Sequence, residues 1–319
     1  MTPFLASSYD RFLCAVLSCF VRRPRGALPT PHGVPSCPEE AACPAPIALD
    51  VDDKEVDGLR VFRAPSPVST PWKNSRDMRG RLLGPDAARN AVIVLHGACD
   101  NEYTYCQWMG RAFAKAGFRV VVPAAPCHLD RAEDHTFSGA PLFWSTDLVT
   151  AGIAQWLTEV HGLVGWLHGQ GATSVGILGY SLGSLVGGLA ATLWPELDFV
   201  ALLAPVGHHL HAIQHSRAAA CVWPWMRRTS PAEAALLDRW APLYRRPVVQ
   251  RLLFLKTMHD VLQPTELQQN WWRDWGRPPA HEYPHGHMSV LFCRQMYRDL
   301  EAFAAERVRN TAETPVLSP

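Results

Sequence analysis

The chain has 319 residues, of which 48% are hydrophobic and 18% charged, and this ordinary globular usage excludes disordered, collagen-like and coiled-coil chains. A chain of this length can bury a core that needs neither disulfides nor a structural metal. Thirty basic against twenty-nine acidic residues give a net charge of +1 with the signs interspersed, so we expect no nucleic acid partner.

Nine cysteines are scattered along the chain without a C-x-x-C pair. The odd count and the spacing argue against a disulfide framework and against a zinc knuckle. Most of them lie in apolar runs, where a free cysteine behaves as a small buried hydrophobe. We therefore expect a reducing, cytoplasmic environment.

The first segment with a clear pattern is the ten-residue apolar run 12–21 (FLCAVLSCFV), which Arg22, Arg23 and Arg25 follow. A helix needs about twenty apolar residues to span a bilayer. A secretory signal would carry its positive charges before the run and not after it. Two interpretations remain: a helix docked on the main domain, or an amphipathic helix in weak contact with a membrane surface. Residues 1–48 are predicted to form this helix and a Pro-rich linker.

Downstream, short apolar runs alternate with longer helical patterns and no repeat of fixed period appears, which is typical of a parallel sheet flanked by helices. The fold class is therefore α/β, with one domain over residues 49–308 and a flexible tail over 309–319. We expect strands at residues 59–62, 91–95, 118–122, 174–178, 199–203 and 251–255. We expect helices at residues 105–116, 145–168, 184–194 and 288–308.

The sequence Gly179-Tyr180-Ser181-Leu182-Gly183 matches the G-x-S-x-G pattern between a predicted strand and a predicted helix. This context is typical of a nucleophile elbow, a tight turn from which the serine hydroxyl projects above the sheet. The two glycines are needed because side chains at these positions would not fit in the turn. Ser181 is the predicted nucleophile, and a plain turn serine is the alternative.

A nucleophilic serine needs a base within hydrogen-bond reach, which a third group orients. In this arrangement the acid and then the base follow the serine along the chain. Asp260 stands on a loop just past the predicted strand 251–255 and is the predicted acid. His259 beside it is a competing histidine, which we interpret as a neighbour on the acid loop.

The base is His287 or His285, both in the sequence Pro-His-Gly-His-Met-Ser that opens the last predicted helix. We prefer His287, because Gly286 before it would let the backbone turn and bring the ring over the sheet toward Ser181. His285 is then an ordinary loop histidine.

Four segments together resemble the α/β-hydrolase superfamily, in its serine-nucleophile branch, over residues 49–308. They are the predicted strand followed by His96-Gly97, the elbow GYSLG, the loop HDVLQP and the segment HGHMSV. The N-terminal YDRFLCAVLSCFVRR and the ending GHMSVLFCRQMYRDLEAF are also similar to a sparsely characterised group of α/β-hydrolase-domain proteins. The resemblance implies a mostly parallel central sheet flanked by helices.

The resemblance also implies a mechanism, in which Ser181 attacks a carbonyl carbon, His287 takes and returns the proton, and Asp260 fixes the imidazole tautomer. The backbone N–H groups of Leu182 and Ala98, with Cys99 as the alternate to Ala98, would bind the oxyanion. The loop after His96-Gly97 departs from the family's pattern, because it lacks the extra glycines of the lipase HGGG motif. We interpret His96 as a structural residue of that loop.

About forty-five residues separate the last two predicted strands, which is long for a connection in a compact domain and indicates a helical cap around residues 207–248. Its apolar side chains suit a hydrophobic acyl ester, or they only pack the cap on the core. Trp223 and Trp225 of the cap, together with Cys99 and Tyr180, are the predicted substrate-binding residues.

If the start of the cap is helical, His208, His211 and His215 share one face at a spacing that suits a metal ion. No carboxylate or cysteine joins them at close spacing, and a serine mechanism needs no metal. We therefore expect neither a metal nor another cofactor.

These observations predict a serine hydrolase of the carboxylesterase or lipase type that acts on a small-molecule or lipid ester. An acyltransferase or a thioesterase would use the same three residues. The alternative from another class is a non-catalytic scaffold that serves as a binding module, because a fold does not guarantee a function. The oligomeric state is not predicted.

Overall fold

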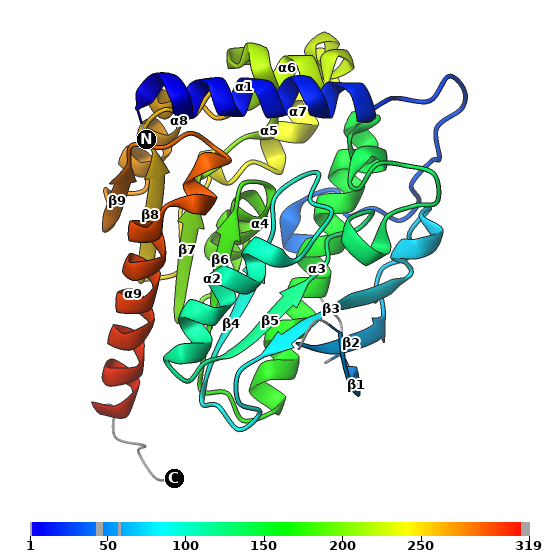
Figure 1. Ribbon diagram of the computed structural model, residues 1–319. Coiled ribbons are helices and arrows are strands. Elements are labelled where there is room, and N and C mark those ends of the chain that lie inside the picture. The colour runs from blue at the N-terminus through cyan, green and yellow to red at the C-terminus, as the bar shows by residue number, and fades with distance from the viewer. Residues whose placement is uncertain (1, 43–46, 57–58, 314–319) are drawn as a thin grey trace.

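The computed structural model describes residues 2–42, 47–56 and 59–313, and a nine-stranded sheet crosses these ranges in the order β1-β2-β3-β5-β4-β6-β7-β8-β9 (Figure 1). Neighbouring strands from β5 to β9 in this order pair in parallel, whereas β1, β2 and β3 add an antiparallel end. The strands are β1 (Asp50–Val56), β2 (Leu59–Pro65), β3 (Asp77–Leu83), β4 (Asn90–Leu95), β5 (Arg119–Pro123), β6 (Ser174–Tyr180), β7 (Phe199–Leu203), β8 (Leu252–Thr257) and β9 (Ala280–Tyr283).

Every residue of the five central strands β4 to β8 is buried. Helices α2 (Thr104–Lys115) and α9 (Arg294–Glu313) pack on one face of the sheet, and α3 (Thr146–Gly169), α4 (Leu182–Leu193) and α8 (Thr265–Asp274) pack on the other (Figure 1). Strands covered on both faces read as continuous apolar runs. This is why the sequence predicts these five strands and the helices between them.

The strands β1 and β3, both in the antiparallel part of the sheet, were not predicted. In β3 (DMRGRLL) charged residues alternate with buried ones, so no continuous apolar run marks the strand. In β1 (DVDDKEV) most residues are charged, and its pairing with β2 shifts register between Asp52 and Glu55.

The predicted start of the last helix at residue 288 was wrong. Residues Ser289–Phe292 form a separate 3₁₀ turn, Cys293 is extended, and α9 begins only at Arg294. The apolar spacing continues through this break, so the pattern does not reveal it. Helix α9 also runs to Glu313, so residues 309–313 of the predicted tail are helical, and residues 314–319 lie outside the described ranges.

The connection between β7 and β8 contains three short helices, α5 (His209–His215), α6 (Arg217–Val222) and α7 (Pro231–Arg239). Ser216 caps α6 and also donates a hydrogen bond to the carbonyl oxygen of Val261, in the loop after β8. In Figure 1 these helices lie above the carboxyl ends of the parallel strands. The segment predicted as a cap therefore covers the edge of the sheet to which the elbow belongs.

Helix α1 (Pro3–Phe20) lies across the same end of the molecule and packs on α6 and on the turn before α9 (Figure 1). Its buried residues Ala6, Asp10 and Cys14 follow each other at intervals of four, which places them on one side of the helix. The apolar run at the N-terminus is therefore part of a helix docked on the domain. Within the described ranges, every helix is too short or too polar to cross a membrane.

A buried ion pair joins the loop after β5 to α3. The guanidinium of Arg131 donates to both carboxylate oxygens of Glu159, at 2.7 and 2.8 Å, and the two side chains are 0% and 1% exposed. Arg131 also donates to the carbonyl oxygens of Ala124 and Ser75. The pair therefore holds this loop against the helix.

We expect Glu159→Ala to lower the free energy of unfolding by about 3–5 kcal/mol, because it leaves the buried guanidinium of Arg131 without its counter-charge. Urea denaturation of the purified protein measures the change. The control is Glu301→Ala, which removes the exposed pair with Lys115 and is expected to cost at most about 1 kcal/mol. Equal losses in the two variants would contradict this account of the core.

Candidate active site

Ser181 stands at the turn between β6 and α4 with φ 53° and ψ −114°, a conformation that is strained for a residue with a side chain. The turn is closely packed. A Cβ on Gly179 would lie 2.3 Å from the carbonyl oxygen of Gly183, and a Cβ on Gly183 would lie 2.3 Å from that of Leu95. Both glycines are therefore required for space, and the local geometry is that of the predicted elbow.

His287 lies between Ser181 and Asp260, and both of its ring nitrogens have a partner. Its Nε2 is 2.7 Å from Ser181 Oγ, and its Nδ1 is 2.7 Å from Asp260 Oδ2. The carboxylate favours the tautomer in which Nδ1–H donates to it, so that Nε2 accepts the serine hydroxyl. The histidine and the aspartate are only 3% and 7% exposed. The structure thus brings the three predicted residues into one chain of hydrogen bonds.

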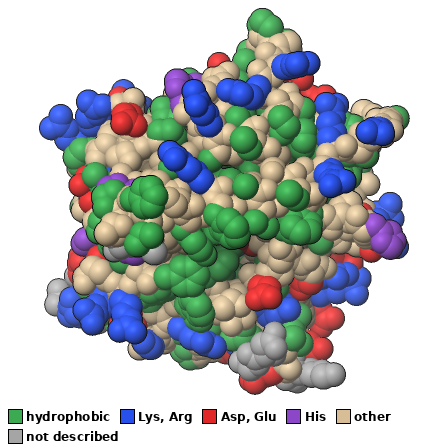
Figure 2. Space-filling view, turned by 45° about the horizontal axis from the view of Figure 1, so that its top comes forward, with side chains coloured by type: hydrophobic (Ala, Val, Ile, Leu, Met, Phe, Trp, Pro, Cys, Tyr) green, Lys and Arg blue, Asp and Glu red, His purple; other side chains and the backbone are tan. Residues whose placement is uncertain are grey.

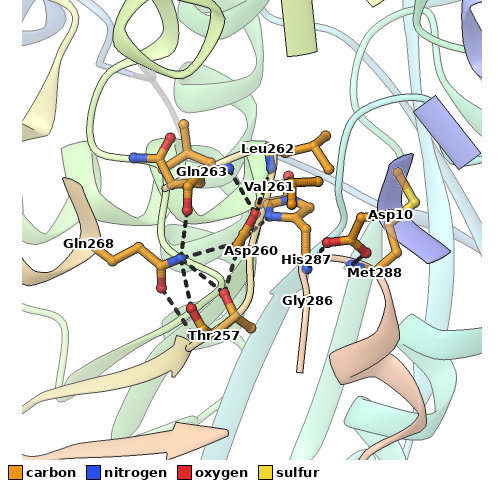
Figure 3. A network of polar contacts seen from close by, with 12 residues as sticks. Asp10, Thr257, Asp260, Val261, Leu262, Gln263, Gln268, Gly286, His287 and Met288 are labelled. Carbon is orange, nitrogen blue, oxygen red and sulfur yellow. Dashed lines mark hydrogen bonds and ion pairs between the residues drawn. The ribbon is translucent and has the colours of Figure 1, made fainter. Parts of the chain in front are cut away.

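The carboxylate of Asp260 is held by four donors (Figure 3). Its Oδ1 accepts the backbone N–H groups of Leu262 and Gln263, at 2.9 and 2.8 Å. Its Oδ2 accepts the hydroxyl of Thr257 at 2.8 Å and the side-chain amide of Gln268 at 3.2 Å. Both oxygens are therefore fixed in the direction of the imidazole.

The surroundings of His287 favour its charged form. Burial alone would lower the pKa of this imidazole, but the charge and the hydrogen bond of Asp260, together with the charges of Asp10 and Asp100, outweigh burial and raise the pKa above its ordinary value of 6.5. A histidine with a raised pKa is a stronger base, so it can accept a proton from a neighbouring hydroxyl.

The other two histidines lie near this chain without joining it. The carbonyl of His285 accepts the backbone N–H of His259 at 3.0 Å, and burial lowers the pKa of the His285 ring. We expected Gly286 to allow a turn of the backbone before His287, and its φ is not in the left-handed region that favours glycine. A Cβ at this position would instead lie 2.3 Å from Oδ2 of Asp10, so the glycine provides space for that carboxylate.

The loop after β4 approaches Ser181 and is shaped by His96. The Nε2 of His96 accepts the backbone N–H of Ala125 at 2.9 Å, and its Nδ1–H donates to the carbonyl of Gly97 at 2.7 Å. Burial lowers the pKa of His96 to about 4, so the ring is neutral. These contacts agree with a structural role for His96.

Ala98 and Leu182, the predicted oxyanion-binding residues, line one small cavity together with Ser181. In the described part of the chain, neither backbone N–H donates a hydrogen bond to another protein group. Asp100 accepts the N–H of the neighbouring Gly97 at 2.8 Å and so stabilises the loop in this position. Two N–H donors thus remain available beside the serine hydroxyl.

A mainly apolar cavity of about 360 Å³ opens at Ser181 and His287. Its lining includes a group of residues from α1 that sequence reasoning missed, because the apolar run at the N-terminus indicates a docked helix but not the place where it docks. These residues are Tyr9, Leu13, Val16 and Leu17. The N-terminal helix is therefore one wall of the candidate substrate pocket.

Three of the four predicted substrate-binding residues, Cys99, Tyr180 and Trp223, line this cavity. Trp225 does not line the cavities at Ser181, and its indole N–H donates to the carbonyl oxygen of Phe143 at 2.5 Å. The prediction of Trp225 as a substrate-binding residue is corrected on this point. Trp225 lies in the 3₁₀ turn Pro224–Arg228, and at three residues per turn a side chain two positions after Trp223 points to another side.

The cap histidines have partners within the protein. Nε2 of His208 lies 2.8 Å from Oδ1 of Asp238, and its ring stacks on that of His211 with the centroids 4.0 Å apart. Among the described residues, no group of three or more His, Cys, Asp or Glu side chains is arranged to hold a metal ion.

The profile of the family described as "Alpha/beta hydrolase domain containing 18" matches residues 61–211. This span contains the elbow with Ser181 but ends before Asp260 and His287. A search of curated proteins returned no significant match.

Solved structures resemble the chain at low sequence identity. Acetyl xylan esterase 1 from Thermoanaerobacterium sp. JW/SL YS485 has a TM-score of 0.60 at 16% identity over 92% of this chain and 98% of its own. The acetyl xylan esterase from Paenibacillus sp. R4 has a TM-score of 0.58 at 16% identity, over 90% and 98%.

The Pyrococcus horikoshii acylaminoacyl peptidase has a TM-score of 0.59 at 15% identity over 82% of this chain, which spans only 43% of the peptidase. At such identities the likeness concerns the fold, and it agrees with the parallel sheet, the elbow and the family profile. The chain therefore has the α/β-hydrolase fold, and its residues 61–211 match the profile of an α/β-hydrolase-domain family.

Proposed function

We propose that the protein is a serine hydrolase that cleaves carboxylic esters through an acyl-enzyme on Ser181. The observation that carries the proposal is the chain of hydrogen bonds from Ser181 through His287 to Asp260, which lies at the mouth of an apolar cavity. Nucleophilic catalysis by a serine requires a base within hydrogen-bond reach and a third group that orients this base. Ser181, His287 and Asp260 have this arrangement.

In the proposed reaction, Ser181 Oγ attacks the carbonyl carbon of the ester while its proton passes to Nε2 of His287. The resulting imidazolium is stabilised by Asp260, and the oxyanion accepts the N–H groups of Leu182 and Ala98. The C–O bond to the leaving alcohol then breaks, and His287 returns the proton to that alcohol. Water attacks the acyl-enzyme by the same steps and releases the acid.

The cavity supports a hydrophobic acyl group as the preferred substrate. Its walls from α1 and the cap are apolar, with Leu13, Leu17 and Trp223 among the lining residues. An acyl chain that enters such a pocket leaves water and gains about 0.8 kcal/mol per buried methylene. A thioesterase or an acyltransferase would use the same groups, so the nature of the leaving group and of the acceptor decides between these activities.

The outer side of α1 supports contact of the protein with the surface of an anionic membrane. Phe4, Phe12 and Phe20 are 78%, 65% and 58% exposed, and Arg22 and Arg23 follow the helix. Figure 2 shows apolar side chains gathered on the end of the molecule that carries α1, with Lys and Arg side chains around them. Aromatic side chains beside basic ones suit the boundary between acyl chains and anionic head groups.

We expect a fluorophosphonate probe, which phosphonylates activated serines, to label the wild-type protein. Ser181→Ala and His287→Ala should abolish labelling, because one lacks the nucleophile and the other lacks its base. His285→Ala is the matched control and should still be labelled, since among the described residues its ring forms no hydrogen bond with Ser181. In-gel fluorescence measures labelling, and a folded wild-type protein without label would favour the non-catalytic scaffold.

The rate of ester hydrolysis should depend on the protonation of His287. Because the pKa of this residue is raised, we expect kcat/KM to reach half its maximum above pH 6.5 and to fall as the pH decreases further. In Asp260→Asn, burial dominates, so this midpoint should move to lower pH, and kcat should fall by roughly 10⁴-fold because the tautomer is no longer fixed. An unchanged midpoint in the variant would contradict the assignment of Asp260.

We expect the protein to sediment with phosphatidylcholine vesicles that contain phosphatidylserine, and less with vesicles that lack it. The double variant Phe4→Ser/Phe12→Ser should reduce the bound fraction at least about tenfold, since the burial of each Phe side chain in the membrane contributes about 1.5–3 kcal/mol to the free energy of binding. Val248→Ser, at an exposed apolar residue of the segment before β8, is the control. Equal binding of all three proteins would refute contact through α1.

A further inference from the structure

A carboxylate from the N-terminal helix is bonded to the backbone of the candidate base. Oδ2 of Asp10 accepts the N–H of His287 at 2.5 Å, and Oδ1 accepts the N–H of Met288 at 3.0 Å. Figure 3 shows the two bonds and the position of Asp10 beside the loop that carries His287. The side chain is completely buried, although 277 residues separate it from His287 along the chain.

With the contact to Asp10, every polar group of His287 has a hydrogen-bond partner. Its carbonyl oxygen accepts the hydroxyl of Tyr180 at 3.1 Å, and its two ring nitrogens face Asp260 and Ser181. Asp10 therefore holds the one remaining polar group, the backbone N–H. Without Asp10, the backbone N–H of His287 would have no partner, although the ring must remain aligned with both Asp260 and Ser181.

The loop is shaped to receive this carboxylate. A Cβ on Gly286 would lie 2.3 Å from Oδ2 of Asp10 and 3.0 Å from the carbonyl oxygen of Ala6. The backbone of Gly286 does not have a positive φ, so the conformation of the loop does not by itself demand glycine. The close approach of α1 is what excludes a side chain here.

Burying a carboxylate to dock a helix costs free energy, because the charged group loses its contacts with water. Burial raises the pKa of Asp10, and the nearby charge of Asp260 raises it further, while the bonds to the two N–H groups and the charge of His287 act in the opposite direction. An apolar side chain could dock α1 at lower cost, as Cys14 does one turn later, where it is 1% exposed. The bonds of Asp10 thus serve the loop more than the docking of the helix.

We propose that Asp10 is a positioning residue for the candidate active site: it fixes the backbone of His287 so that the ring stays aligned between Asp260 and Ser181. The inference rests on the proposed serine hydrolase function. It gives one side chain of α1 a role in aligning the base, while other residues of the helix form a wall of the substrate pocket.

The kinetic test compares Asp10→Asn and Asp10→Ala with the wild type in the full chain, on a short p-nitrophenyl ester. Because a displacement of about 1 Å at a reacting group can cost 10²-fold in rate, we expect kcat to fall between roughly 10- and 10²-fold with KM little changed. Asn keeps the shape of Asp but can accept only one of the two N–H groups. Ser7→Ala removes another polar contact of α1, to the carbonyl of His259, and should leave kcat unchanged.

A second variant approaches the same contact from the loop. Gly286→Ala should reproduce the loss of kcat, because its Cβ displaces the carboxylate of Asp10. In Asp10→Ala/Gly286→Ala the obstructing carboxylate is gone, so the second substitution should add much less than it does alone. Fully additive losses would overturn the proposal, provided that near-ultraviolet circular dichroism shows each variant to be folded.

The backbone amide of His287 provides a readout that does not depend on activity. Its proton resonance should lie downfield in the wild type, because of the bond to a carboxylate, and move upfield in Asp10→Asn but not in Ser7→Ala. If the wild type takes the fluorophosphonate label while Asp10→Asn changes neither kcat nor this resonance, the role of Asp10 is refuted alone. If the folded wild type takes no label, the proposed function fails, and the positioning role fails with it.

Discussion

The imidazole of His287 is hydrogen-bonded at both ring nitrogens. The rest of the structure must therefore hold the residues on both sides of the ring, Ser181 and Asp260, in fixed positions. Ser181 follows β6, Asp260 follows β8, and His287 itself follows β9. The carboxyl ends of parallel strands open on one edge of a sheet, so three loops that are distant in sequence converge there. The close-packed interior below gives that edge the rigidity that a ring bonded on two sides needs.

Convergence brings polar groups together under a cover of helices, and this has a cost. A buried carboxylate is tolerated only where donors replace the water that it loses. Asp260 has four donors besides His287, and Asp10 has two backbone N–H groups. Because both carboxylates are buried, each of these interactions is stronger than at the surface. Both carboxylates are therefore stable in the site because these hydrogen bonds compensate their burial.

Helix α1 connects this interior with the outside of the molecule. Residues on one side of the helix, such as Leu13 and Leu17, line the cavity at Ser181, while Phe4 and Phe12 on the other side are exposed. The same element thus contributes to the shape of the pocket, to the support of the histidine loop and to the apolar surface above the pocket. A single amphipathic helix can combine these contacts because its residues repeat on each face every three to four positions.

The sequence by itself determined the features that depend on neighbours along the chain. The buried strands are visible as continuous apolar runs, and the elbow is visible because Gly179 and Gly183 must lack side chains within one turn. Ser181 and Asp260 could be predicted since each stands just past such a strand. Strand β3 was missed because its alternating charges hide it, and the start of α9 was misplaced because the apolar spacing runs through a 3₁₀ turn.

Only the tertiary structure decided which histidine lies beside Ser181, that Trp225 bonds to Phe143 and does not line the pocket, and that Asp10 reaches the histidine loop. The physical reason is that each of these contacts joins segments from different parts of the chain. The pattern of apolar residues along one element predicts which of its residues are buried. The partner of a buried polar group, however, depends on how separate elements pack against one another.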